Sequence, residues 1–312
     1  MCLLSRAVLL PLLCCCAALL SACSGDSSTS TGTSATQLSS QEIDAPRATG
    51  DLASDGLSWI NYRRQQAGLS PSQRDPRIDR AASAHALYQQ LNNLVTHDEV
   101  PGKTGFSGVN STDRLQAAGY PLNRDALADG EVIAAIAESD GFAAADGLLT
   151  AIYHRYLMLE PRFDQAGAGG AHRAGGYYWL NVNFVATRTA TGLGAGRVVV
   201  WPASGQKNVR TDFMSDEETP DPVPERNRVG YPISVHADLG RTLRVNSFTV
   251  SESGGSPLDV RQLDHQSDND TPASAVAIIP LSPLRNGVVH DVAFNGSLDG
   301  RPVSLTWSFT TQ

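Results

Sequence analysis

The sequence predicts an α+β region followed by an all-β region, and three observations support this division. Between residues 52 and 188, apolar side chains recur first at helical spacing and then with the alternation of strands. Beyond residue 196 only short strand patterns remain, separated by Pro and Gly turns. Between the two regions, residues 189–196 are small or flexible apart from Leu193. We therefore place one domain at residues 51–189 and a second at 196–312.

Helix start and stop signals define four helices in the first domain. Asp75-Pro76 is a helix start with Pro at the first position, and one apolar face follows it at three- and four-residue spacing as far as Leu91. Further helices are expected at 57–66, ended by Gly68, at 112–118, ended by Gly119, and at 142–153. Residues 165–169 and 177–186 then have the pattern of a β-hairpin around a Gly-rich turn.

The second domain has the pattern of a β-sandwich. Leu305, Trp307 and Phe309 alternate with polar residues, as expected of a last strand with one buried face. An acidic, Pro-rich stretch at 216–228 interrupts the strands as a long loop. The expected strands are 197–201, 233–236, 242–250, 258–263, 275–279, 289–294 and 303–310.

The N-terminus has the features of a lipoprotein leader. Arg6 precedes an apolar run at 7–20 that is too short to span a bilayer, and Leu20-Ser21-Ala22-Cys23 forms a lipobox. We expect cleavage after residue 22, acylation of Cys23 and attachment to a membrane through the lipid. An ordinary signal peptide, in which Cys23 has no special part, is the alternative. Residues 23–50 are rich in Ser and Thr and are expected to form a disordered tether.

Composition restricts the partners of the mature chain. All five cysteines lie between Cys2 and Cys23, so the folded domains contain no disulfide. The net charge is −8, and it becomes −9 when the leader and Arg6 are removed. Such a charge disfavours nucleic acid and offers no basic stretch for an anionic membrane surface. The expected location is the cell envelope, and in a Gram-negative organism the outer membrane, because Ser24 rather than Asp follows Cys23.

A series of short motifs follows one order along the first domain: Ala67-Gly68-Leu69, Asp75-Pro76, His85-Ala86, Thr96-His97, Asp113-Arg114, Ala118-Gly119-Tyr120, Gly130-Glu131, Tyr153-His154-Arg155, Pro161-Arg162 and Gly167-x-Gly169. With these motifs in this order, the domain resembles bacterial members of the CAP superfamily, which includes cysteine-rich secretory proteins, venom antigens and plant pathogenesis-related proteins. The resemblance implies an α-β-α sandwich in which a central antiparallel sheet lies between helical layers. The early strand Tyr231-Pro232-Ile233 and the ending Trp307-Ser308-Phe309-Thr310 are typical of the immunoglobulin-like modules that follow such domains.

The resemblance also implies a cleft with two histidines and two acids. Carried over by position, these fall on His97, Glu131 and His154, and the fourth position, an acid in many members, falls near Ala151. The expected set is therefore a triad at most. Gly130-Glu131-Val132 also lacks the Asn of the family motif, which puts activities that need the complete set in doubt.

Two kinds of function fit this triad. Two imidazoles and a carboxylate can hold Zn²⁺ with a position open for water, so one hypothesis is a zinc-dependent hydrolase of peptide or glycan, with His97 and His154 as ligands and Glu131 as ligand or catalytic base. The spacings of 34 and 23 residues form no local metal signature. The favoured hypothesis is therefore a domain that binds a small hydrophobic ligand or an envelope polymer without established catalysis. Purely structural roles also stay open: a buried ring at His97, a helix-end ring at His154 and a helix-start carboxylate at Glu131.

Overall fold

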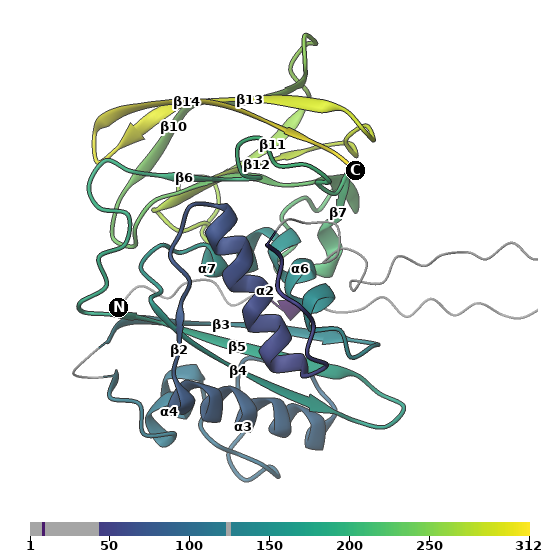
Figure 1. Cartoon of the computed structure of the whole chain (residues 1–312), viewed down its shortest axis with the longest axis vertical. Helices are drawn as coiled ribbons and strands as arrows, with labels where there is room; N and C mark the ends of the chain where they lie inside the picture. Colours follow the sequence, from purple (N-terminus) through teal and green to yellow (C-terminus); the bar gives the residue numbers. More distant parts are fainter. Residues whose placement is uncertain (1–7, 10–43, 123–125) are drawn as a thin grey trace, which may run out of the picture.

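The computed structural model describes residues 8–9, 44–122 and 126–312 (Figure 1). Cys23, most of the leader and the tether as far as residue 43 lie outside the described residues, so the lipid anchor stays a prediction. In the described part, no helix is long and apolar enough to cross a membrane.

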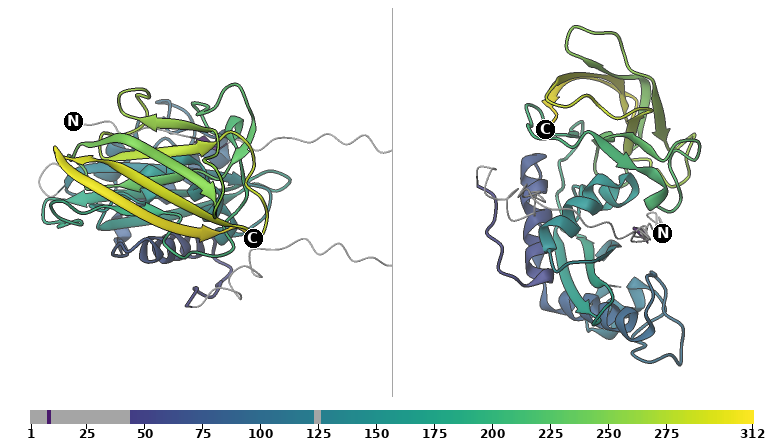
Figure 2. Two further views of the ribbon diagram at one scale, coloured as in Figure 1. Left: turned by 90° about the horizontal axis from the view of Figure 1, so that it is seen from above. Right: turned by 90° about the vertical axis from the view of Figure 1, so that its right-hand side faces the viewer.

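A sheet with the strand order β1-β3-β5-β4-β2 forms the centre of the first domain. Its three long strands are antiparallel, and the two-residue strands β1 and β2 pair in parallel at the edges. Helices α2, α6 and α7 lie on one face of the sheet, and α3 and α4 lie on the other (Figures 1 and 2). The elements are β1 (Val8–Leu9), α2 (Leu52–Gln66), β2 (Gln73–Arg74), α3 (Pro76–Asn92), α4 (Ser111–Ala117), β3 (Ala126–Ile136), α6 (Gly141–Thr150), α7 (Ile152–Met158), β4 (Gln165–His172) and β5 (Tyr178–Thr187).

The helix predictions hold for α3 and α4, and two others need correction. Helix α2 begins five residues before the predicted start, because the Asp51 side chain accepts a hydrogen bond from the Ser54 amide and caps the helix there. The single helix predicted at 142–153 is wrong. Ala151 has extended backbone angles (φ −72°, ψ 125°), which end α6 and let α7 start in a new direction. His154 therefore lies in the first turn of a helix and not at the end of one.

Close packing explains the Gly167-x-Gly169 motif. A Cβ atom on Gly167 would lie 2.3 Å from the backbone nitrogen of Asp79, and one on Gly169 would lie 2.1 Å from that of Ser83. Helix α3 thus packs its backbone directly against β4, which is possible only where the strand has no side chains. This contact fixes α3, and with it the segment that follows, on the sheet.

The second domain is all-β, and the predicted strands are present. A three-stranded antiparallel sheet, β10-β13-β14, and a four-stranded antiparallel sheet, β11-β12-β9-β6, make up most of it. The predicted acidic loop is bounded by a short hairpin, β7 with β8, that the sequence pattern did not indicate. The strands are β6 (Val199–Trp201), β7 (Asp212–Met214), β8 (Arg228–Gly230), β9 (Ile233–His236), β10 (Leu243–Glu252), β11 (Val260–Asp264), β12 (Ala275–Pro280), β13 (Val289–Leu298) and β14 (Arg301–Thr310).

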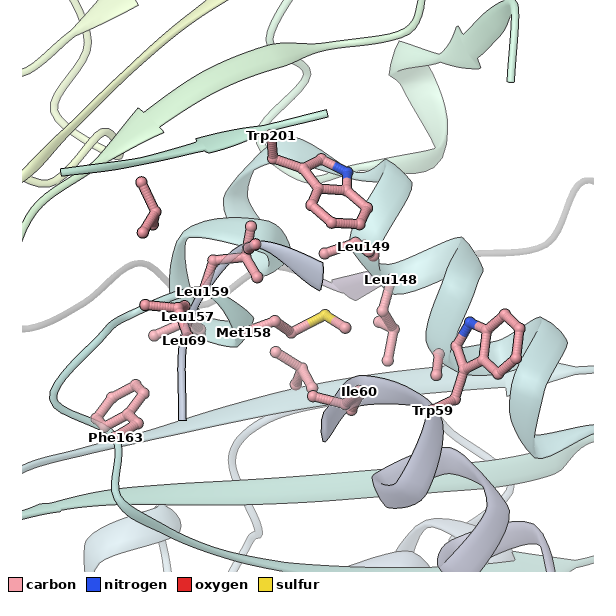
Figure 3. Packing of buried hydrophobic residues seen from close by; sticks show 14 of the residues in the cluster. Trp59, Ile60, Leu69, Leu148, Leu149, Leu157, Met158, Leu159, Phe163 and Trp201 are labelled. Atoms are coloured by element: carbon pink, nitrogen blue, oxygen red, sulfur yellow. The ribbon is translucent and has the colours of Figure 1, made fainter. Parts of the chain in front are cut away.

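The two domains share a hydrophobic core. Trp201 of β6 packs in one cluster with Leu149 and Leu157 of the first domain (Figure 3). All seven residues of α7 are buried, because this helix lies between the first-domain sheet and the second domain. The buried guanidinium of Arg155 donates to the Pro232 carbonyl at 2.6 Å and lies 4.8 Å from the centre of the Tyr231 ring. Removing the second domain would therefore expose an apolar helix of the first.

Candidate functional site

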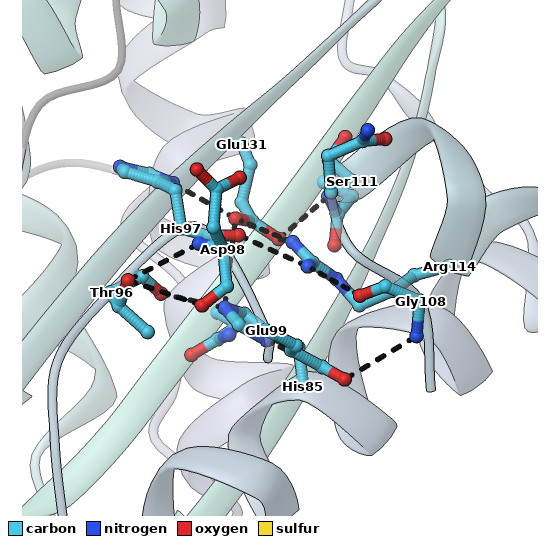
Figure 4. A network of polar contacts seen from close by, with 12 residues as sticks. His85, Thr96, His97, Asp98, Glu99, Gly108, Ser111, Arg114 and Glu131 are labelled. Atoms are coloured by element: carbon cyan, nitrogen blue, oxygen red, sulfur yellow. Dashed lines mark hydrogen bonds and ion pairs between the residues drawn. The ribbon is translucent and has the colours of Figure 1, made fainter. Parts of the chain in front are cut away.

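The carboxylate of Glu131 is the centre of a buried polar network on the α3 face of the sheet (Figure 4). Arg114 donates to both of its oxygens through one guanidinium nitrogen, at 2.9 and 2.7 Å. The His97 ring contacts Glu131 Oε1 through Nδ1 at 2.9 Å, and Asn183 donates to Oε2 at 3.1 Å. Three side chains from three other parts of the chain thus converge on one carboxylate.

Ordinary local structure brings these groups together. Glu131 lies in the middle of β3, directly opposite Asn183 on β5. Helix α3 ends at Asn93, whose left-handed backbone (φ 51°) reverses the chain and leads residues 96–99 back over the sheet. Arg114, from α4, also donates to the His97 carbonyl at 3.0 Å and so fixes the backbone beside the ring. The prediction that Glu131 could be a helix-start carboxylate is wrong, because it lies within a strand.

These contacts keep Glu131 ionised. Burial by itself raises the pKa of Glu131, but the charge of Arg114, that of His85 and the hydrogen bond from His97 outweigh burial and hold the pKa well below its usual range. A carboxylate that is paired in this way is a weak base. Its main effect is on His97: when Nδ1 donates to Glu131, the neutral ring has Nε2 as its acceptor nitrogen.

A second pair of a histidine and a carboxylate, His85 with Glu99, lies beside the pair formed by His97 and Glu131. His85, on α3, is completely buried, and its Nδ1 lies 2.8 Å from Glu99 Oε1 while Nε2 donates to the Thr96 carbonyl at 2.7 Å. Glu99 also accepts hydrogen bonds from the Ser107 and Gly108 amides. Burial raises the pKa of Glu99, but the bonds from His85 and Ser107 lower it by more. The pair therefore fixes both ends of the loop that follows His97.

His154 belongs to a different cluster. Its Nδ1 contacts Glu218 Oε1 at 3.0 Å, and Glu218 comes from the second domain. The same carboxylate accepts hydrogen bonds from the amides of Ile152, Tyr153 and His154, at 2.9, 2.7 and 3.2 Å. It therefore caps α7, which lacks a capping side chain of its own. The His154 Nε2 atom is buried and has no hydrogen-bond partner in the described part of the chain.

The predicted triad is thus assembled only in part. His97 and Glu131 are hydrogen bonded, whereas the ring of His154 bonds to Glu218. Within residues 8–9, 44–122 and 126–312, no group of three or more His, Cys, Asp or Glu side chains is arranged to hold a metal ion. The physical reason is local: Arg114, His97 and Asn183 already occupy the oxygens of Glu131, and a guanidinium lies where a second cation would have to approach. The interpretation of His154 as a helix-end ring is also wrong, because His154 lies in the first turn of α7, at the positive end of the helix dipole.

Several residues of these clusters had no role in the sequence analysis. Arg114 appeared only as part of a motif, Asn183 carried no signal beyond its polarity among apolar residues, and Glu99 is one of several polar residues after the helix. Glu218 lies in the long acidic loop, 64 residues from His154, and no local pattern connects the two.

Two hollows of the described surface lie away from this network. One, of about 390 Å³, is lined by Arg64, Gln73, Asp164 and the linker at 189–193. Another, of about 410 Å³, lies between the end of α2 and strands β6 and β14. Both border the junction of the two domains and contain none of the predicted site residues.

The fold and the site together define a class: an α-β-α domain in which a buried histidine, carboxylate and arginine meet on strand β3. The model of the cysteine-rich secretory protein family, CAP, matches residues 57–186, and this match identifies the first domain as a CAP domain. The resemblance found in the sequence is thereby confirmed for the first domain.

Two solved structures are similar to part of the chain. An extracellular protein containing an SCP domain from Bacillus anthracis is 27% identical over 43% of this chain, with a TM-score of 0.36. The match spans 39% of the length of that protein. An outer surface protein from Borrelia burgdorferi is 17% identical over 42% of this chain and 90% of its own, with a TM-score of 0.35. The comparison with curated proteins finds no match.

Proposed function

We propose that this chain is a lipid-anchored envelope protein whose CAP domain binds a small ligand or an envelope component at His97 and does not cleave it. In this proposal Cys23 carries the lipid, and the second domain is an immunoglobulin-like module. The observation that carries the proposal is the complete engagement of the Glu131 carboxylate by Arg114, His97 and Asn183.

A serine hydrolase needs a hydroxyl that donates to a histidine, and the described part of this site has no serine in that position. Glu131 is held ionised and shared among three donors. The nearby hydroxyls of Ser107 and Ser111 donate to Glu99 and Asp129, at 2.9 and 2.6 Å, and not to a histidine. A zinc hydrolase has less support, because the Glu131 oxygens that would bind the metal already accept hydrogen bonds from Arg114, His97 and Asn183. By contrast, a ring oriented by a buried carboxylate is suited to recognition, because its rotation is already restricted before a ligand binds.

Ligand binding is tested by titrating the protein with a soluble peptidoglycan fragment and, separately, with a short-chain phospholipid. One of these is expected to shift the NMR signals of the His97 ring, and His97→Ala is expected to weaken its binding at least about tenfold. His172→Ala is the matched control, since His172 is an exposed ring stacked on Tyr178 on the same sheet. Turnover of either probe, or equal binding by both variants, would overturn the proposal.

Lipid attachment has its own test. Cys23→Ala is expected to move the protein from the membrane fraction to the soluble fraction of cells, because no other anchor is predicted. Unchanged fractionation would exclude the lipoprotein assignment and leave the ligand question open.

A further inference from the structure

The described surface has one concentration of exposed apolar side chains. Eight large hydrophobic residues are exposed in the described part of the chain, and five of them fall between residues 87 and 109. These five are Leu87, Leu91, Val100, Phe106 and Val109, with exposed fractions of 40–53%. Single exposed apolar residues need no explanation, but such a concentration indicates a surface that contacts a membrane or another protein.

The five residues belong to one structural unit, the solvent side of α3 and the loop that folds over its end. Leu87 and Leu91 are four residues apart and share one face of the helix. The Thr104 carbonyl accepts a hydrogen bond from Asn92 at 2.9 Å, and a Cβ atom on Gly105 would lie 3.0 Å from the Leu91 side chain. The loop tip therefore rests beside Leu91. We call residues 100–106, all of which are exposed, the α3 loop.

The α3 loop is a shaped projection. Two consecutive turns form it: the Lys103 amide donates to the Val100 carbonyl, and the Phe106 amide donates to the Lys103 carbonyl. Its base is fixed, because the Val100 amide donates to the Tyr88 hydroxyl at 3.0 Å and Glu99 holds Ser107. It projects at the end of the molecule opposite the second domain (Figures 1 and 2).

The charge of the α3 loop also differs from that of the rest of the chain. Lys103, at its tip, is one of two lysines in a chain of net charge −8, and residues 100–106 include no acid. Apolar side chains beside a long, flexible cation match the interface of a bilayer, in which the alkyl groups enter the acyl boundary and the ammonium group meets phosphate. A second protein would be expected to cover a broader surface than this narrow projection offers.

We propose that the α3 loop inserts into the surface of the membrane to which the protein is anchored. This rests on the proposed function, in which acylated Cys23 anchors the chain. The lipid keeps the domain near the bilayer, so the local concentration of lipid is high and a weak contact is sufficient. The loop then decides which face of the domain meets the membrane, and His97, three residues before Val100, is held close to the lipid surface.

The absence of cysteine after Cys23 allows a direct test. Phe106→Cys, in the full lipidated protein, is labelled with an environment-sensitive dye and placed in zwitterionic phosphatidylcholine–phosphatidylethanolamine vesicles. Val289→Cys is the matched control, because Val289 is 42% exposed and lies in the second domain. We expect a blue shift at position 106 and at least about threefold greater quenching by brominated lipid there than at position 289.

Equal quenching at the two positions would overturn the proposal. So would a blue shift at position 106 that appears without vesicles and grows with protein concentration, since a second copy of the chain would then cover the loop. Val100→Asp with Lys103→Glu, measured with the same probe, is expected to abolish the quenching while the near-ultraviolet spectrum of the folded domain is kept.

The same probe in a Cys23→Ala background separates this proposal from the lipid anchor. If the anchor is correct and the loop inserts, the variant leaves the membrane fraction but still shows weaker quenching at high lipid concentration. If Cys23→Ala stays with membranes and position 106 is quenched, the lipoprotein assignment fails and loop insertion stands. Release of the variant, with no quenching at position 106 in the anchored protein, supports the anchor and excludes insertion.

Discussion

Glu218 and His154 are 64 residues apart in the sequence and belong to different domains, yet their side chains are in contact at 3.0 Å. The resemblance places the fourth acid near Ala151, at the junction between α6 and α7. In this chain the carboxylate that lies there comes from the acidic loop of the second domain, and it also caps α7. The second domain is therefore part of the structure that holds His154, and not a separate spacer.

Glu218→Ala is expected to destabilise the whole protein. It removes the acceptor of three buried amides and of one imidazole, and unsatisfied buried donors of this kind cost on the order of 3 kcal/mol or more together. Urea unfolding measures the change. Asp216→Ala is the control, since Asp216 is exposed in the same loop and should change the free energy of unfolding by less than about 0.5 kcal/mol. Equal effects of the two variants would contradict the capping role.

A chain that ends at residue 189 is expected not to fold cooperatively. It would leave Ile152, Tyr153 and Tyr156 in water, although the complete chain buries them against Phe213 and Ile279. Circular dichroism with thermal unfolding and the dispersion of amide NMR signals are the measurements. A sharp transition together with well-dispersed signals would show that the first domain is independent of the second.

Arg114→Met is expected to lower the free energy of unfolding by about 3–5 kcal/mol, because it leaves the charge of Glu131 buried and without its main partner. Adding Glu131→Leu should restore part of this loss, since it removes the unpaired charge. Arg80→Met is the control: the Arg80 guanidinium donates to a backbone carbonyl at an exposed position. A double variant less stable than Arg114→Met alone would show that the pair does not act as a unit.

The stability of the interface between domains is expected to depend on Glu160. Burial raises the pKa of Glu160 to about 7 from its usual value of 4.5, despite hydrogen bonds from the Arg162 and Leu239 amides. A raised carboxyl pKa contributes stability that is present below pH 4.5 and is lost as the pH rises through 7. The loss amounts to about 3 kcal/mol.

Glu160→Gln stays neutral and should therefore gain stability relative to the wild type as the pH rises from about 5 to 8. The difference between the two proteins is the measurement, because His236 acts in the opposite direction. Burial lowers the pKa of His236 to about 3, so its contribution is lost as the pH falls below 6.5. A difference that does not vary over this pH range would contradict the assignment to Glu160.

Zinc is expected not to bind tightly at the predicted triad. Calorimetric titration of the full protein should give no one-to-one binding that His97→Ala with His154→Ala removes, because Arg114 occupies the face of Glu131 that a metal would need. Binding of one ion that the double variant abolishes would restore the metal site and the hydrolase hypothesis.

The sequence predicts most of the secondary structure because its signals are local. Asp75-Pro76 starts α3 through the cap and the preset backbone angle of proline, and the alternation of Leu305, Trp307 and Phe309 reports one buried strand face. The break at Ala151 had no such signal. No Gly or Pro marks it, and it follows from the way α7 packs between the two domains.

The amino-acid sequence by itself determined the family of the first domain and the β class of the second, and it predicted a lipoprotein leader and the candidates His97, Glu131 and His154. Only the tertiary structure decided which of these side chains are in contact, and with which partners. The contacts of Glu131 with Arg114 and Asn183, and those of His154 with Glu218, join residues 17, 52 and 64 positions apart. Residues so far apart leave no periodic pattern, because their proximity depends on strand register, helix packing and domain docking, which arise from the burial of the whole apolar surface.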